Sequence, residues 1–124
     1  TIINKANYMS SSESTNSKQL QGYLSELRTL QLKLESAPVQ EKMEHSLSIQ
    51  EQKKFIQTRI NLSTNISELE SQAINEIADK LQKNESALRQ GIASLSATID
   101  RLASSIETLQ GMATLIGTIS RIIA

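Results

Sequence analysis

The sequence predicts an all-α fold, an antiparallel helical hairpin or bundle with one long coiled-coil helix at the C-terminal end. From Ile92 to Ile123, apolar residues recur at alternating spacings of three and four, the spacing that holds one helix face against a partner helix. The 124-residue chain has only three aromatic residues and one proline, which is few for a mixed α/β domain. Helix-on-helix packing does not need them, because leucine, isoleucine and alanine can fill the ridges between helices.

The first elements expected are a flexible, serine-rich N-terminal tail over residues 1–17 and a helix over residues 18–36. The tail is predicted because residues 10–17 are polar and show no hydrophobic period. Asn16 and Gln19 have the spacing of a capping box, which would start the helix. Pro38 would end it, because proline disfavours helical geometry in the residue before it.

Two further helices, over residues 39–61 and 65–124, complete a predicted helical domain spanning residues 18–124. The first of the two is rich in charged residues and has one apolar edge, and Asn65 with Glu68 would cap the next helix. Nothing after residue 65 forces a stop, although a break near Asn84 would give four helices instead of three. The chain starts with Thr1 and ends among apolar residues, so we expect it to be a piece of a longer protein.

The residues predicted to form a helix–helix interface are the apolar positions of the first and last helices. The positions flanking this seam in the last helix carry no charge, which favours burial against more than one neighbour, as in a three- or four-helix bundle. Because these helices leave much of the last one uncovered, we expect a homo-oligomer or a helical partner protein to cover the remainder. The predicted interface residues are Leu20, Tyr23, Leu27, Leu30, Leu34, Ile92, Leu95, Ile99, Leu102, Ile106, Leu109, Ala113, Ile116 and Ile123.

Charge and composition argue against several classes of function. Thirteen basic and thirteen acidic residues cancel, so the long-range field of a nucleic-acid-binding protein is not expected. With no cysteine and one histidine, the chain predicts no catalytic residues, no metal site, no cofactor and no small-molecule ligand. His45 lies four residues after Glu41, and we interpret the pair as an exposed helical charge pair.

The favoured hypothesis is a non-enzymatic coiled-coil module for self-assembly or protein–protein interaction. The alternative is a secreted, membrane-active helical protein that uses its apolar C-terminal third, where residues 108–120 carry no charge. In composition the chain resembles the secreted helical subunits of bacterial type III secretion systems, which implies a translocator or filament component. A viral multimerisation domain would show the same features. The absence of cysteine fits both the cytosol and secretion without disulfides.

Overall fold

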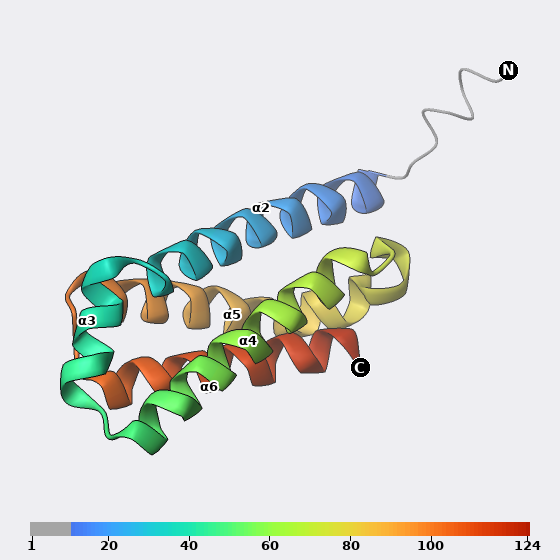
Figure 1. Cartoon of the computed structure of the whole chain (residues 1–124). Coiled ribbons are helices and arrows are strands. Elements are labelled where there is room, and N and C mark those ends of the chain that lie inside the picture. Colours follow the sequence, from blue (N-terminus) through green and yellow to red (C-terminus); the bar gives the residue numbers. More distant parts are fainter. Residues whose placement is uncertain (1–10) are drawn as a thin grey trace, which may run out of the picture.

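The computed structural model describes residues 11–124, and over that range the chain is helical apart from short connections (Figure 1). The all-α prediction is confirmed, and the helices form a bundle. The helices are α2 (Ser11–Leu34), α3 (Ala37–Ser46), α4 (Ile49–Ser71), α5 (Ile74–Asp100) and α6 (Ser105–Ile123).

Four long helices form the bundle, and the short helix α3 joins α2 to α4 at one end of it (Figure 1). Around the bundle, α2 packs against α5, α5 against α6, α6 against α4, and α4 against α2. Helices α2 and α5 run in one direction and α4 and α6 in the other. Because of the packing order around the bundle, the face formed by α2 and α5 lies opposite the face formed by α4 and α6.

The buried core is made of leucine and isoleucine with few aromatic residues, and it includes Phe55 from α4 and Met112 from α6. Every long helix contributes one apolar face to it. No side-chain nitrogen or oxygen atom is buried without a hydrogen-bond partner among the described residues. The core therefore closes by hydrophobic burial without leaving an unsatisfied polar group.

Several predicted helix boundaries are wrong, and the caps explain why. Helix α2 already begins at Ser11, so the expected tail is partly helical; residues 1–10 lie outside the described range. The helix predicted for 39–61 is divided at Leu47 and Ser48, where the Ser48 side chain and Glu51 form a capping box. The break expected at 61–65 is absent, and α4 continues to Ser71.

The long helix predicted for residues 65–124 is the largest error. It is replaced by the end of α4, then by α5, a turn at residues 101–104, and α6 running back along α5. The break considered near Asn84 does not occur, because Asn84 lies inside α5. At the turn, the Ser104 side chain accepts a hydrogen bond from the Glu107 backbone N–H and so starts α6.

The turn between α5 and α6 is a Schellman motif with a leucine at its left-handed position. Leu102 has φ of 49°, the one positive φ at a non-glycine residue in the described range. Its N–H donates to the carbonyl of Ile99, and the N–H of Ala103 donates to that of Thr98, both at 3.0 Å. Glycine usually occupies this position, because a side chain is strained there. The sequence therefore contains no glycine or proline signal for the turn.

Candidate association surfaces

The predicted interface residues before the turn are buried inside this one chain. On α2 they pack towards the bundle interior, and on α5 they meet residues of α2 and α6. The helix–helix contacts that these residues make therefore lie within one chain. These residues are Leu20, Tyr23, Leu27, Leu30, Leu34, Ile92, Leu95 and Ile99.

The predicted interface residues after the turn stay at or near the surface. Leu102 is 42% exposed and Ile106 is 58% exposed. Ala113 is exposed as well, whereas Leu109, Ile116 and Ile123 are half-buried. Intramolecular packing thus leaves this half of the predicted seam only partly covered.

Helix α6 turns a different apolar face towards the core. Its fully buried apolar residues lie one position before the predicted seam, at Met112, Leu115, Ile119 and Ile122. Gly111 permits the close approach of α5, since a Cβ there would lie 3.0 Å from Leu95 Cδ1. Helix α6 is therefore apolar on two faces. We call the second face, which is only partly covered, the α6 outer stripe; it is formed by Ile106, Leu109, Ala113 and Ile116, of which Leu109 and Ile116 also pack against the core.

The α6 outer stripe borders a shallow groove between α4 and α6. Ile106, Leu109 and Ala113 line one wall, and Glu51 and Lys54 line the other. Farther along, Asn65 of α4 donates from Nδ2 to the carbonyl oxygen of Ile116 at 3.4 Å and to Ser120 Oγ at 3.2 Å. The groove therefore has an apolar wall on α6 and a wall with one charge of each sign on α4.

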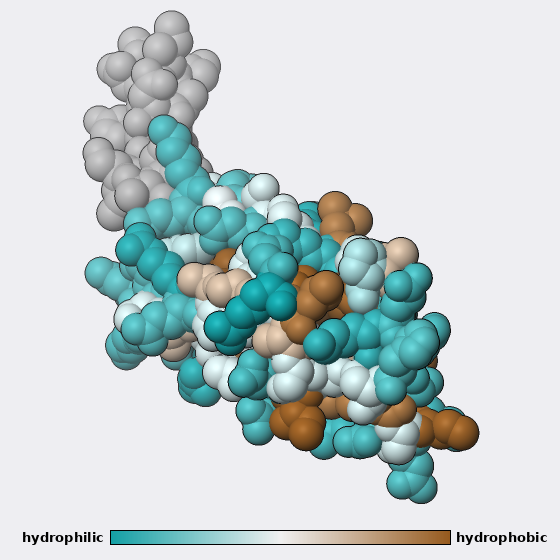
Figure 2. All heavy atoms as spheres, turned by 90° about the vertical axis from the view of Figure 1, so that its left-hand side faces the viewer, coloured by the Kyte–Doolittle hydropathy of each residue, from teal (hydrophilic) through white to brown (hydrophobic). Residues whose placement is uncertain are grey.

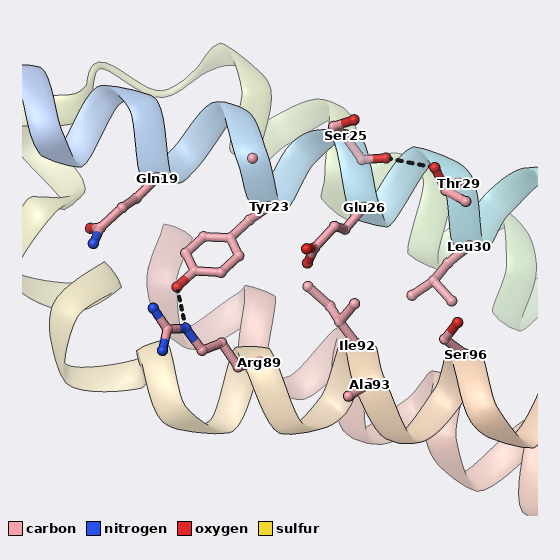
Figure 3. A pocket seen from close by; sticks show the side chains of 11 residues that line it. Gln19, Tyr23, Ser25, Glu26, Thr29, Leu30, Arg89, Ile92, Ala93 and Ser96 are labelled. Atoms are coloured by element: carbon pink, nitrogen blue, oxygen red, sulfur yellow. Dashed lines mark hydrogen bonds between the residues drawn. The ribbon is translucent and has the colours of Figure 1, made fainter.

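A larger groove, of about 600 Å³, lies on the opposite face between α2 and α5 (Figure 3). Tyr23, Leu30 and Ile92 form its apolar floor, where Leu30 and Ile92 point towards each other. Its walls carry mostly small side chains, and a Cβ placed at Gly22 would have no neighbour within 4 Å. The small wall residues are Gly22 and Ser25 on α2 and Ala93 and Ser96 on α5.

A ring of hydrogen bonds fixes the register of α2 against α5 at one end of this groove. Tyr23 donates from its hydroxyl to Glu85 Oε1 at 2.8 Å, and Arg89 Nε donates to the Tyr23 hydroxyl at 3.0 Å. Arg89 Nη2 also lies 2.7 Å from Glu85 Oε1. Burial raises the pKa of Tyr23 above 10.0, and the bond to Glu85 raises it further, against the opposing effect of Arg89. The tyrosine therefore stays a neutral donor at physiological pH.

The α2–α5 groove was not predicted from the sequence, although a signal for it was present. Gly22, Ser25 and Thr29 recur at spacings of three and four beside the apolar face of α2, and Ala93 and Ser96 do the same on α5. Small residues beside a seam leave room next to a helix pair. That signal could have been recognised only by knowing that these two helices are neighbours.

Metal ligands, the histidine and membrane-spanning segments were also considered within the described range of residues 11–124. No group of three histidine, aspartate or glutamate side chains between residues 11 and 124 is placed to hold a metal ion. His45 is exposed, and its Nδ1 lies 2.7 Å from the carbonyl oxygen of Glu41. Of the helices described, none is both long and apolar enough to cross a membrane.

The chain matches no family model, and the comparisons with curated proteins and with solved structures found no match. Its surface must therefore be interpreted from its own residues. At the end of the bundle formed by α3 and the α5–α6 turn, apolar residues appear as separate patches between hydrophilic ones (Figure 2).

Proposed function

We propose that this protein is a non-enzymatic helical module that associates with further copies of itself through the α6 outer stripe. The observation that carries the proposal is the second apolar face of α6, on which Ile106 is 58% exposed after the bundle has closed. A large apolar side chain at the surface gains about 1.5–3 kcal/mol when it is fully buried. Association supplies that burial without unfolding the bundle.

Solution mass tests the proposal. Light scattering after size exclusion, over a tenfold range of concentration, should give a mass that rises above 13.7 kDa as concentration increases. Ile106→Asp should return the protein to 13.7 kDa at every concentration, because it would place an unpaired charge in a dry contact. Its helicity should be unchanged, since the side chain it replaces is mostly in solvent.

Ile56→Asp is the matched control. Ile56 on α4 is 45% exposed and does not line the α4–α6 groove, so the same change there should leave the mass unaffected. The proposal fails if the wild type stays at 13.7 kDa throughout or if Ile106→Asp assembles as the wild type does.

A second candidate is membrane activity, which the uncharged run of residues 108–120 and the two apolar faces of α6 support. Flotation with anionic and neutral liposomes separates the candidates. A module whose apolar faces serve packing and self-association should remain unbound to lipid. A membrane-active protein should float with the vesicles and should lose that property in Ile106→Asp.

A further inference from the structure

The turn between α5 and α6 is made of residues that favour a helix. It contains Arg101, Leu102 and Ala103, and these three residue types have some of the highest helix propensities. In the bundle, Leu102 is held instead at φ of 49°, where a residue with a side chain is strained. The backbone of the turn would therefore relax if the chain continued through it as a helix.

Straightening the turn costs no backbone hydrogen bond, because the same donors and acceptors only exchange partners. In the turn, the N–H of Leu102 donates to the carbonyl of Ile99, and the N–H of Ala103 donates to that of Thr98. In a continuous helix each N–H bonds four residues back, so Leu102 would donate to Thr98 and Ala103 to Ile99. The hydrogen bonds therefore do not oppose the change.

The core face of α6 is what keeps this helix folded back along α5 (Figure 1). That face packs against α5 and α4, and a released α6 would expose it to water at a large cost. The site that buries it is formed by α4 and α5, and every other copy of the chain carries an identical site. The side chains that fit this site are Met112, Leu115, Ile119 and Ile122, all fully buried in the bundle.

We infer that two copies of the chain can exchange α6. In the exchanged dimer the turn is straight, α5 and α6 of each copy form one helix, and each α6 fills the site in the other copy. Exchange of an identical element closes a two-fold dimer. Leu102 and Ile106, which are 42% and 58% exposed, lie beside the point where the two chains cross, so exchange brings them close to their counterparts.

The exchange goes beyond the association proposed through the α6 outer stripe, because it depends on the turn and on the core face of α6. A stripe contact forms between closed bundles and is reversible on dilution. An exchanged α6 must leave its site before the copies separate. The exchanged dimer should therefore form when chains fold together at high concentration, and it should survive dilution.

A disulfide between α5 and α6 tests the exchange. A Cβ at Gly111 would lie 3.7 Å from Leu95 Cβ, within the range that a disulfide spans. The chain has no cysteine of its own, so in Leu95→Cys/Gly111→Cys the introduced pair is the one available. Its disulfide stays within one chain in a closed bundle and joins two chains in an exchanged dimer. Gly111→Cys alone is the control for unspecific cross-linking.

The double variant is refolded from urea at low and at high protein concentration, diluted, oxidised and run on a denaturing gel without reductant. We expect a band at twice 13.7 kDa that strengthens with the refolding concentration and is missing in Gly111→Cys. A band at 13.7 kDa alone at every refolding concentration overturns the exchange, although the association through the stripe then stands. A failure of the stripe proposal, read from the mass of Ile106→Asp, leaves this result unaffected.

Substitutions at Leu102 add a test that does not depend on cysteines. Glycine relieves the strained φ of the turn and weakens a continuous helix, whereas alanine does the reverse. After refolding at high concentration and dilution, light scattering should find roughly tenfold less dimer for Leu102→Gly than for Leu102→Ala. An equal or reversed order overturns the straightening of the turn, and this comparison decides the matter if the double cysteine variant lacks the helicity of the wild type.

Discussion

Replacing Leu102 by glycine and by alanine tests the turn that divides the last two helices. Leu102 has φ of 49°, where an L-residue is strained by roughly 1–2 kcal/mol and glycine is not. Both substitutions remove the same half-exposed side chain, so their difference isolates the backbone. We expect Leu102→Gly to be more stable than Leu102→Ala by about 1 kcal/mol.

Thermal unfolding followed by circular dichroism measures this difference. For a domain of this size, about 1 kcal/mol corresponds to a Tm that is about 3–5 °C higher for the glycine variant. Inside a helix the order is reversed, because alanine is favoured over glycine by about 1 kcal/mol. A Leu102→Ala protein that melts above Leu102→Gly would refute the turn and would restore the continuous helix that the sequence predicts.

Three other predictions follow from local contacts. Gly22→Ala should raise the free energy of unfolding by about 1 kcal/mol, because alanine is favoured over glycine inside a helix. Gly111→Ala should lower the free energy of unfolding, because the new Cβ would meet Leu95 Cδ1 at 3.0 Å. Urea unfolding compares the two variants, and equal effects would contradict the close packing of α5 on α6. Hydrogen bonds from Ser48 lower the pKa of Glu51, so Glu51→Gln should destabilise the protein at neutral pH. The difference in stability between variant and wild type should shrink as pH falls from 4.5 towards the lowered pKa. A difference in stability that persists at pH 2 would exclude the capping box as its source. In a Tyr8→Phe background, ultraviolet titration should show Tyr23 ionising above pH 10.0, the ordinary pKa of a tyrosine. The stability of the protein should fall as pH rises beyond that value. A Tyr23 that ionises at pH 10.0 would contradict the bonding of its hydroxyl to Glu85.

The sequence was sufficient to predict the fold class and which residues of the first helix are buried. The spacing of Leu20, Tyr23, Leu27, Leu30 and Leu34 allows one apolar face, and that face is the one buried. The same reasoning succeeded for Ile92, Leu95 and Ile99, where the competing positions are polar or small. Hydrophobic periodicity identifies a buried face reliably when a helix has only one.

Helix α6 could not be predicted in the same way, because it has two apolar faces. Leu109, Ala113 and Ile116 continue the period that begins on α5, but Met112, Leu115 and Ile119 have the same spacing one residue earlier. Hydrophobic periodicity alone does not show which of these two faces is buried, because that depends on the reversal of the chain between α5 and α6. The available signal was Ser104 followed three residues later by Glu107, the spacing of a capping box. Ser48 and Glu51 have the same spacing and mark the other missed helix start.

The second apolar face of α6 also limits how strong the association is expected to be. A stable interface buries about 800 Å² from each partner, whereas the α6 outer stripe is a single row of four residues, of which Leu109 and Ile116 are already half-buried. The stripe alone is therefore too small for a tight dimer, and we expect the mass of the wild type to rise above 13.7 kDa only towards the upper end of the concentration range.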